Sequence, residues 1–398
     1  MNSNLNKLIL FGAGQIGCDA LAFFGLEKVD YFADNNVKLQ GTDYCGKRVI
    51  DINEVKELVC YGYTVVVSVL DYGAIVNQLK KEGIENYLIY KDIAAKAYTH
   101  IPFKSPKAPL VNYSAFHSPG DELNFAQKRK ENFTDNQENL IRTYVNSVKD
   151  NVPLFQYIEV ETVNRCNGTC SFCPVNARVD KRAYKKMSVE LFKSIVDQLS
   201  ELNYSGYFSP FSNNEPLLDK RLEQFLSYAR EKLPNAWLYF YTNGTLLTAQ
   251  RLKQIIDNVN EIIIDNYCTD GELTEQCKII VRELEEHPKW IGKVHIDIRN
   301  SEEILLTRGG TSPNRSIMID YGEFSCAYPF TQMVVRPDGK VSLCCNDALG
   351  NYTLGDLTKQ SITDVWYSDT YKNLRTAIAK GRKYYRNCSK CDSMEARF

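Results

Sequence analysis

The sequence predicts an α/β protein. Short apolar segments alternate with segments of helical periodicity within the first 95 residues and again from residue 153. This alternation, with helices of about 10–15 residues, is typical of βα units and parallel sheets. Near the C-terminus, two apolar segments flank Asp338-Gly339, which predicts a β-hairpin. We therefore expect four parts: 1–95, a linker at 96–152, a second α/β region at 153–305, and a hairpin-and-helix region at 306–398.

Composition excludes several classes of protein. The chain has 398 residues, with 48 Lys and Arg against 49 Asp and Glu, a formal net charge of −1. This balance offers no broad basic surface for nucleic acid or an anionic membrane. The chain lacks an apolar run long enough to span a bilayer and begins without the organisation of a signal peptide, so we expect a cytoplasmic protein. Thirteen cysteines in that compartment favour metal or redox use over disulfides.

The first region contains glycines in the pattern of a nucleotide-binding turn. KLILFGAG predicts a strand entering the turn, residues 15–24 predict a helix, and VDYFADN and TVVVSVL predict two further strands. Gly12, Gly14 and Gly17 have the spacing of a Rossmann fingerprint, and Asp34 ends the second strand. Such glycines allow close approach to a phosphate, and the carboxylate binds a ribose hydroxyl. The region is therefore predicted to be a Rossmann-like domain.

The same region resembles the N-terminal Rossmann-like domain of sugar O- and N-acyltransferases. The resemblance rests on the glycine turn, the Asp34-Asn35 pair, the segment GTDYCG and a strand that ends in serine. It implies a site for a nucleotide-linked sugar in preference to NAD. A structural module with an unused glycine turn remains the alternative.

The second α/β region begins with the strand FQYIEVE, which leads into three cysteines. Cys166, Cys170 and Cys173 form a C-x3-C-x2-C run. A fully ligated 4Fe–4S cluster takes four thiolates, so three leave one iron open and indicate chemistry on a bound small molecule. A zinc knuckle or separate core thiols are the alternatives, but zinc requires a fourth Cys or His nearby, and the next ones are distant.

This run, with Phe172 before the third cysteine, resembles the motif of the radical S-adenosylmethionine (SAM) superfamily. The resemblance implies that the open iron binds SAM and that SAM cleavage gives a 5′-deoxyadenosyl radical, which abstracts hydrogen from the substrate. It also implies a partial (β/α)6 barrel with its site at the strand C-termini. Further strands are predicted at YSGYFSPFS, AWLYFYTN, EIIID and VHIDIRN, with helices at 188–201, 220–233, 248–259 and 271–286.

Later strand ends carry further residues that this resemblance assigns to SAM. SNNEPLL stands at the place of the family's G-G-E-P-L motif with Asn at both glycines, and TNG resembles the turn that contacts the ribose. Arg299 is expected to pair with the SAM carboxylate, because arginine binds carboxylates bidentately. The alternative for the T-N-G segment is an ordinary Asn-Gly turn, and the alternative for Arg299 is a surface salt bridge. The residues expected to contact SAM are Asn214, Glu215, Thr242, Asn243, Asp265 and Arg299.

The hairpin-and-helix region contains a second set of cysteines. Cys326 and Cys344 bracket the first part of the hairpin, and Cys388 and Cys391 follow a helix predicted at 361–379. Four thiolates match a fully ligated 4Fe–4S cluster, with zinc as the alternative. The region resembles the SPASM/twitch extension of radical SAM enzymes, in the one-cluster form of the aminocyclitol dehydrogenase type.

Together, these resemblances imply an oxidation. A radical on a carbinol carbon becomes a ketone by losing one electron and one proton, and an auxiliary 4Fe–4S cluster is placed to accept the electron. We therefore expect an oxidoreductase acting on a sugar, cyclitol or nucleotide-linked sugar, reduced by a flavodoxin or ferredoxin. Arg308 or Arg299 is the expected proton acceptor. The alternatives are an epimerase with Cys268 as hydrogen donor and a peptide-modifying enzyme, although no winged-helix peptide module is apparent.

Overall fold

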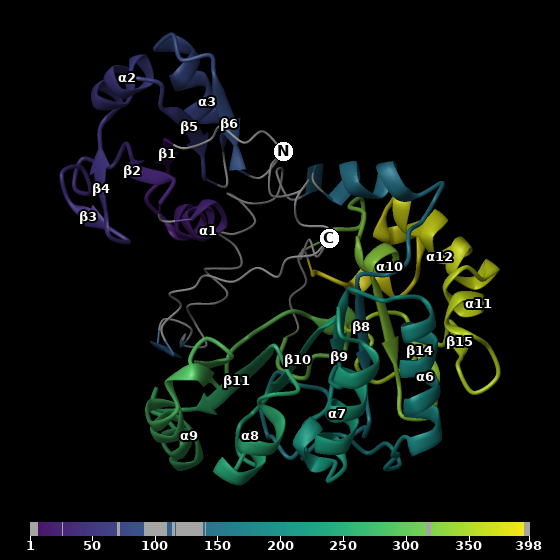
Figure 1. The fold of residues 1–398 in the computed structure, drawn as a ribbon. Helices are drawn as coiled ribbons and strands as arrows, with labels where there is room; N and C mark the ends of the chain where they lie inside the picture. Colours follow the sequence, from purple (N-terminus) through teal and green to yellow (C-terminus); the bar gives the residue numbers. More distant parts are fainter. Residues whose placement is uncertain are drawn as a thin grey trace. The chain divides into compact units, whose positions relative to one another are not determined.

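The computed structural model describes residues 7–25, 27–69, 72–90, 110–113, 116, 138–139, 141–315 and 320–393 (Figure 1). The chain divides into two compact units, residues 1–108 and 109–398. Much of the predicted linker, 96–152, lies outside the described residues. Within the described part of the chain, no helix has both the length and the apolar character needed to cross a bilayer.

The first unit is built on a six-stranded sheet. Five strands are parallel in the order β4-β2-β1-β5-β6, and β3 is antiparallel to β4 at the edge. The strands are β1 (Leu8–Phe11), β2 (Val29–Ala33), β3 (Asp43–Tyr44), β4 (Lys47–Ile50), β5 (Thr64–Val67) and β6 (Tyr87–Ile89). The helices are α1 (Gln15–Phe24), α2 (Ile52–Cys60) and α3 (Tyr72–Lys81).

Both faces of this sheet are buried, because side chains alternate between faces along a strand. In β1, Leu8 and Leu10 belong to one apolar cluster, whereas Ile9 and Phe11 belong to another. Such continuous apolar strands are typical of parallel sheets. Each of the three predicted strand segments contains an observed strand, β1, β2 or β5, and the helix predicted at 15–24 is α1. The predicted alternation of strands and helices is therefore confirmed.

The second unit is built on a nine-stranded sheet in the order β15-β14-β13-β8-β9-β10-β11-β12-β7. Strands β13 through β7 are parallel, and β14 and β15 are antiparallel to their neighbours. The parallel strands are β7 (Val111–Asn112), β8 (Tyr157–Val160), β9 (Tyr207–Ser209), β10 (Trp237–Thr242), β11 (Glu261–Cys268), β12 (Val294–Asn300) and β13 (Gln332–Val335). The antiparallel strands are β14 (Lys340–Ser342) and β15 (Gly355–Asp356).

The helices of the second unit begin at polar caps and bury one face. Ser188, Thr248 and Thr274 each accept a hydrogen bond from a backbone N–H of the first turn, which stabilises the helix start. These caps fix the starts of three of the four helices predicted between the strands. The helices are α6 (Val189–Glu201), α7 (Leu222–Lys232), α8 (Ala249–Ile255), α9 (Glu275–Glu286), α10 (Tyr328–Thr331), α11 (Ile362–Trp366) and α12 (Asp369–Lys380).

The structure differs from the predicted organisation in three places. The hairpin strand β13 pairs with β8, so residues 306–398 join the same sheet as the preceding region. The helix predicted at 361–379 is two helices, α11 and α12, because Ser368 caps a new helix after Ser361 has capped the first. The predicted linker contains a strand, β7, that pairs with β12; the helix at residues 141–148 agrees with the helix that the sequence predicts from Glu138 to Val148.

Candidate functional site

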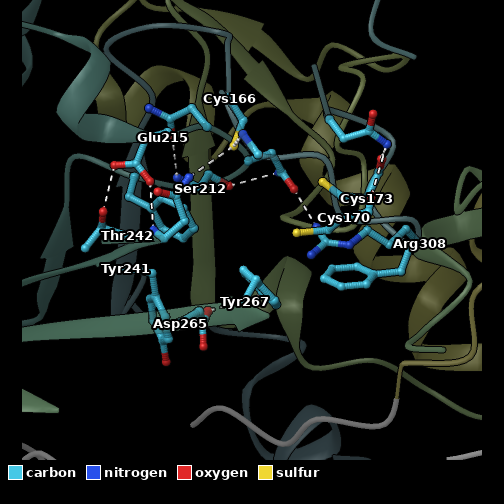
Figure 2. Close-up of a pocket in the computed structure, with 17 residues that line it drawn as sticks. Cys166, Cys170, Cys173, Ser212, Glu215, Tyr241, Thr242, Asp265, Tyr267 and Arg308 are labelled. Atoms are coloured by element: carbon cyan, nitrogen blue, oxygen red, sulfur yellow. Dashed lines mark hydrogen bonds between the residues drawn. The ribbon is translucent and has the colours of Figure 1, made fainter. Parts of the chain in front are cut away.

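A cavity with an empty volume of about 620 Å³ lies at the C-terminal ends of the parallel strands of the second unit (Figure 2). This is the edge at which loops carry function in barrels of parallel strands. Loops after β8 and β9, the end of β10, the middle of β11 and a turn at residues 308–310 all contribute to the lining. Ten predicted site residues line it: Cys166, Cys170, Phe172, Cys173, Asn214, Glu215, Thr242, Asn243, Asp265 and Arg308.

The loop with the first three cysteines is held by local hydrogen bonds. The Asn176 side chain donates to the carbonyls of Cys170 (3.1 Å) and Cys173 (2.7 Å), and the Gly168 N–H donates to the Cys166 sulfur at 3.2 Å. Burial raises the pKa of Cys166 and of Cys170 to about 12. Thiolates in this loop therefore require a cationic centre to compensate for the burial of charge.

The spacing of the cysteines fits a cluster better than a single zinc ion. Tetrahedral zinc with Zn–S bonds of about 2.3 Å places its sulfurs only about 3.8 Å apart. Among the residues that the structure describes, no three cysteine sulfurs all lie within 4.8 Å of one another. Neither predicted cysteine set therefore has three sulfurs at the separations of a tetrahedral zinc site.

Glu215 connects two of the predicted SAM-binding segments. Its carboxylate is almost fully buried and accepts hydrogen bonds from the Thr242 hydroxyl (2.8 Å) and the Asn243 N–H (2.8 Å). Leu217 donates a third hydrogen bond through its N–H at 3.0 Å. Burial raises the pKa of Glu215 to about 7, although these hydrogen bonds act in the opposite direction. Glu215 thus fixes the T-N-G turn against the loop that follows β9.

Asn214 brings a donor to the cavity. The side chain is 4% exposed, and its Nδ2 has no hydrogen-bond partner among the described residues. A buried amide without a partner costs free energy of about 1–3 kcal/mol. A ligand oxygen in the cavity would relieve this cost, so Asn214 fits a polar ligand.

Asp265 and Arg299 form a buried network at the β11–β12 pair. Arg299 contacts Glu303 at 2.5 Å and Asp265 at 3.7 Å, and its guanidinium lies 5.8 Å from the Tyr267 ring centroid. Burial raises the pKa of Asp265 to about 6, with Arg299 opposing the rise. Asp265 and Tyr267 line the cavity, whereas Arg299 is not part of its lining. Arg299 therefore supports Asp265, and a SAM carboxylate would have to compete with two acidic partners for it.

Arg308 and Cys268, the two predicted catalytic residues, are placed differently. Arg308 lines the cavity in a left-handed backbone conformation (φ 49°), and its Nη1 donates to the Asn213 Oδ1 at 2.5 Å. Cys268 is not part of the lining, and its thiol donates to the Arg299 carbonyl at 3.7 Å. Among the residues described, the thiols that line the cavity are those of Cys166, Cys170 and Cys173.

The second set of cysteines lies together on α10, β14 and the C-terminal turn. Cys326 precedes α10, Cys344 follows β14, and Cys388 begins a short turn that ends before Cys391. Burial raises the pKa of Cys344, Cys388 and Cys391, and the neighbouring cysteines of the set raise it further. Four half-buried cysteines whose thiols interact with one another in this way fit a fully ligated cluster.

In the first unit, the predicted nucleotide-binding residues surround the turn between β1 and α1. Asp34 accepts hydrogen bonds from the backbone N–H of Ala13 (2.8 Å) and of Asn36 (2.8 Å). A Cβ on Gly12 would lie 2.7 Å from the Ser68 carbonyl oxygen, and one on Gly17 would lie 2.0 Å from the Gly12 oxygen. A Cβ on Gly14 would meet nothing within 4 Å. Chain packing thus requires Gly12 and Gly17, whereas only Gly14 faces open space.

The disulfide at Cys45 was not expected from the sequence. It lies in the first unit, just before the β4 strand that pairs with β2. All the cysteines assigned to clusters are reduced. The cysteines assigned to clusters form no disulfide, and one disulfide-bonded cysteine in the first unit is not the disulfide framework that the composition argues against.

Sequence reasoning missed several residues of the site. Tyr241, Tyr267 and Phe211 line the cavity, and the Asn213 backbone donates to the buried Glu161 at 2.8 Å. The motif indicates Asn213 only as a replacement for glycine, whereas in the structure the side-chain oxygen of Asn213 accepts a hydrogen bond from Arg308. The alternation in AWLYFYTN, which directs Tyr241 and Tyr239 to one face of β10, was the available signal for the tyrosine.

Two family models match the chain. Residues 160–265 match the radical SAM superfamily, and residues 326–392 match SPASM, an iron–sulfur cluster-binding domain. The S-adenosyl-L-methionine-dependent 2-deoxy-scyllo-inosamine dehydrogenase of Niallia circulans is 29% identical over 243 residues, which cover 61% of this chain and 94% of that protein.

Two solved structures of BtrN are similar to this chain. The crystal structure of BtrN in complex with AdoMet and 2-DOIA is 28% identical, covers 61% of this chain and 94% of its own, and has a TM-score of 0.53. A second BtrN structure, in an open conformation, is 26% identical, covers 61% of this chain and 94% of its own, and has a TM-score of 0.46.

The fold and the site define a radical SAM enzyme with a C-terminal SPASM domain. Its cofactors are SAM, a 4Fe–4S cluster and an auxiliary iron–sulfur cluster. The chain is similar to the SAM-dependent 2-deoxy-scyllo-inosamine dehydrogenase, and this homology supports a radical SAM dehydrogenase or oxidoreductase.

Proposed function

We propose that this enzyme oxidises a carbinol of a sugar, cyclitol or nucleotide-linked sugar to a ketone. The observation that carries the proposal is the pairing of two cysteine sets in one compact unit. One set lines the cavity, and the other lies in the segment whose strand β13 pairs with β8. An oxidation by hydrogen abstraction needs an acceptor for one further electron, and the second set supplies its site.

Each group of residues then has a role. Cys166, Cys170 and Cys173 would hold the first cluster, and SAM bound beside it would supply a 5′-deoxyadenosyl radical. Asn214 offers its buried Nδ2 to a SAM oxygen, and Glu215 holds Thr242 and Asn243 where the ribose would lie. Phe172 and Asp265 complete the lining beside the adenosyl group.

Arg308 is the residue that we assign to the substrate hydroxyl. Its guanidinium reaches the cavity and carries a positive charge there. A cation beside the hydroxyl oxygen favours loss of its proton as the carbon radical loses its electron. The products balance: the C–H hydrogen atom would go to 5′-deoxyadenosine, one electron to the auxiliary cluster that the second cysteine set would hold, and the hydroxyl proton to solvent, because a guanidinium cation has no acceptor for it.

The substrate is proposed to be a small polyol, carried in some cases on a nucleotide. The named relative acts on 2-deoxy-scyllo-inosamine, which supports a cyclitol or sugar here. The matched domains lie within residues 160–392, so the first unit adds a part outside both. Its parallel order β4-β2-β1-β5-β6 is that of the first five strands of a doubly wound nucleotide-binding sheet.

For this first unit, a nucleotide-linked sugar is favoured over NAD. Both carboxylate oxygens of Asp34 accept hydrogen bonds from the protein backbone, whereas the dinucleotide fingerprint uses that carboxylate for the ribose. Only the open side of Gly14 leaves room for a ligand phosphate near α1. We also propose a flavodoxin or ferredoxin as reductant in a cytoplasmic setting.

The test uses a substrate deuterated at the reacting carbon. Incubation of the anaerobic enzyme with SAM and a panel of cyclitols and sugar nucleotides should yield deuterated 5′-deoxyadenosine and one ketone per turnover. A product of unchanged oxidation state that has gained solvent hydrogen would instead identify an epimerase. Among the described residues, the thiols that line the cavity are those of the three cluster cysteines, which supports dehydrogenation over this alternative. Turnover of a peptide but none of these polyols would favour the peptide-modifying alternative.

A further inference from the structure

Two arginines of the C-terminal segment are almost fully buried, and their surroundings differ. Arg375 is 4% exposed and Arg382 is 1% exposed. Both donate hydrogen bonds to backbone carbonyls: Arg375 to Pro329 (2.8 Å) and Trp366 (2.8 Å), and Arg382 to Ser325 (3.3 Å) and Cys391 (3.2 Å). The two residues are therefore a matched pair of buried guanidinium groups seven positions apart in sequence.

The side chains around the two arginines differ in kind. Burial lowers the pKa of Arg375 to about 10, with only tyrosines nearby to oppose it. Arg382 instead has four cysteines as its charged neighbours. These are the four cysteines of the auxiliary set: Cys326, Cys391, Cys388 and Cys344.

The hydrogen bonds fix the Arg382 charge against the cluster loops. Ser325 directly precedes Cys326, and Cys391 is itself a ligand of the set. Arg382 begins the short turn that leads from α12 toward Cys388, and its own N–H donates to the Phe324 carbonyl at 3.0 Å. Both the backbone and the guanidinium of Arg382 are thus held by the segment that enters the cluster site.

We propose that Arg382 tunes the auxiliary cluster electrostatically. The guanidinium of Arg382 holds a fixed positive charge beside the cluster and thereby raises the reduction potential of the cluster. Cluster potentials depend on net charge and on surroundings. Accepting an electron adds a negative charge among four thiolates, and a buried cation nearby stabilises that state in a medium of low dielectric constant. The inference rests on the proposed function, since an electron acceptor needs a potential within reach of the substrate radical.

The experiment compares midpoint potentials in R382Q, R382K and R375Q enzymes loaded with iron and sulfide. Potentials are read by redox titration followed by electron paramagnetic resonance, without substrate. A variant with Cys166, Cys170 and Cys173 all replaced by Ala assigns the auxiliary signal. We expect R382Q to shift the auxiliary midpoint negative, so that the ratio of reduced to oxidised cluster at fixed potential falls about tenfold, which is about 59 mV for one electron.

R382K retains the charge and should keep the wild-type potential, and R375Q should also keep it. Iron and sulfide contents check that each variant holds both clusters. An unchanged auxiliary midpoint in fully loaded R382Q, or an equal shift in R375Q, would overturn the proposal. Failure of the wild-type enzyme to oxidise any polyol would instead count against the proposed function and leave the measured potential shift standing.

A second measurement separates an electrostatic role of Arg382 from a purely structural one. Thermal unfolding is compared for wild type and R382Q in the loaded form and after removal of iron by a chelator. Because the charge of Arg382 is compensated by the cluster, the substitution should lower the melting temperature more in the loaded protein than in the iron-free protein. A destabilisation of equal size in both forms would show a purely structural role and overturn the proposal.

Discussion

The guanidinium of Arg308 donates to the side-chain oxygen of Asn213 at 2.5 Å, and the amide nitrogen of Asn213 donates to the Cys345 carbonyl at 2.9 Å. Asn213 lies on the loop after β9, whereas Cys345 directly follows the cluster ligand Cys344. One side chain therefore joins the residue that we assign to the substrate hydroxyl and the loop that holds the auxiliary cluster.

The first prediction concerns this connection. N213G, which introduces the glycine typical of the family motif, removes both side-chain hydrogen bonds and releases Arg308. Loss of a hydrogen bond to a charged group costs about 1.5–3 kcal/mol, so we expect kcat to fall about tenfold to a hundredfold. N213D keeps the oxygen that accepts from Arg308 and should retain most activity. Steady-state kinetics check this, and a SAM dissociation constant unchanged in N213G would confine the effect to Arg308.

How much of this site follows from sequence depends on the range of the interactions. The cysteine triplet, Glu215 and the T-N-G turn were predicted because each is a short motif at the end of an apolar strand. The contact between Arg308 and Asn213 spans 95 positions, and no local pattern encodes it. The pairing of β13 with β8 is also remote in sequence, which is why the hairpin was expected in a separate part of the chain.

The second prediction distinguishes the two clusters by their iron content. Two 4Fe–4S clusters hold about eight irons, and C326A removes one ligand of the auxiliary set, so its iron content should fall to about four. C326A should still cleave SAM, because the first three cysteines are intact. C166A should also fall to about four irons and lose SAM cleavage. Four irons in wild type, or a zinc stoichiometry of one, would contradict a second iron–sulfur cluster.

The third prediction separates dehydrogenation from epimerisation. Cys268 lies outside the cavity lining, and its thiol donates to the Arg299 carbonyl. C268S keeps a donor of similar size, so we expect kcat within about twofold of wild type, which corresponds to less than about 0.5 kcal/mol. A loss of product with continued formation of 5′-deoxyadenosine would identify Cys268 as a hydrogen donor and contradict the proposed oxidation.

The fourth prediction concerns the pH dependence of stability. Burial raises the pKa of Glu161 from 4.5 to about 7, with the Asn213 N–H opposing the rise. A carboxyl group whose pKa is higher in the folded state binds its proton more tightly there. Its contribution to stability is therefore complete below pH 4.5 and is lost as the pH rises to about 7.

E161Q, which cannot ionise, should remove that contribution to the pH dependence. The measurement is the free energy of unfolding in urea between pH 4.5 and 7.5 for iron-free wild type, E161Q and the surface control E275Q. Wild type should lose more stability than E161Q across this interval, whereas E275Q should follow wild type because Glu275 is exposed. Parallel curves for wild type and E161Q would show that Glu161 is ionised at both ends of the range.

The fifth prediction tests whether the glycine turn of the first unit serves packing or a ligand. A Cβ at Gly17 would lie 2.0 Å from the Gly12 carbonyl oxygen, whereas one at Gly14 would meet nothing within 4 Å. G17A should therefore lower the melting temperature of the enzyme, because α1 must shift away from β1. G14A should fold with a wild-type melting temperature but weaken binding of a nucleotide-linked sugar, measured by calorimetry. Unchanged binding in G14A would mean that the open side of the turn is not the site and that this unit is structural.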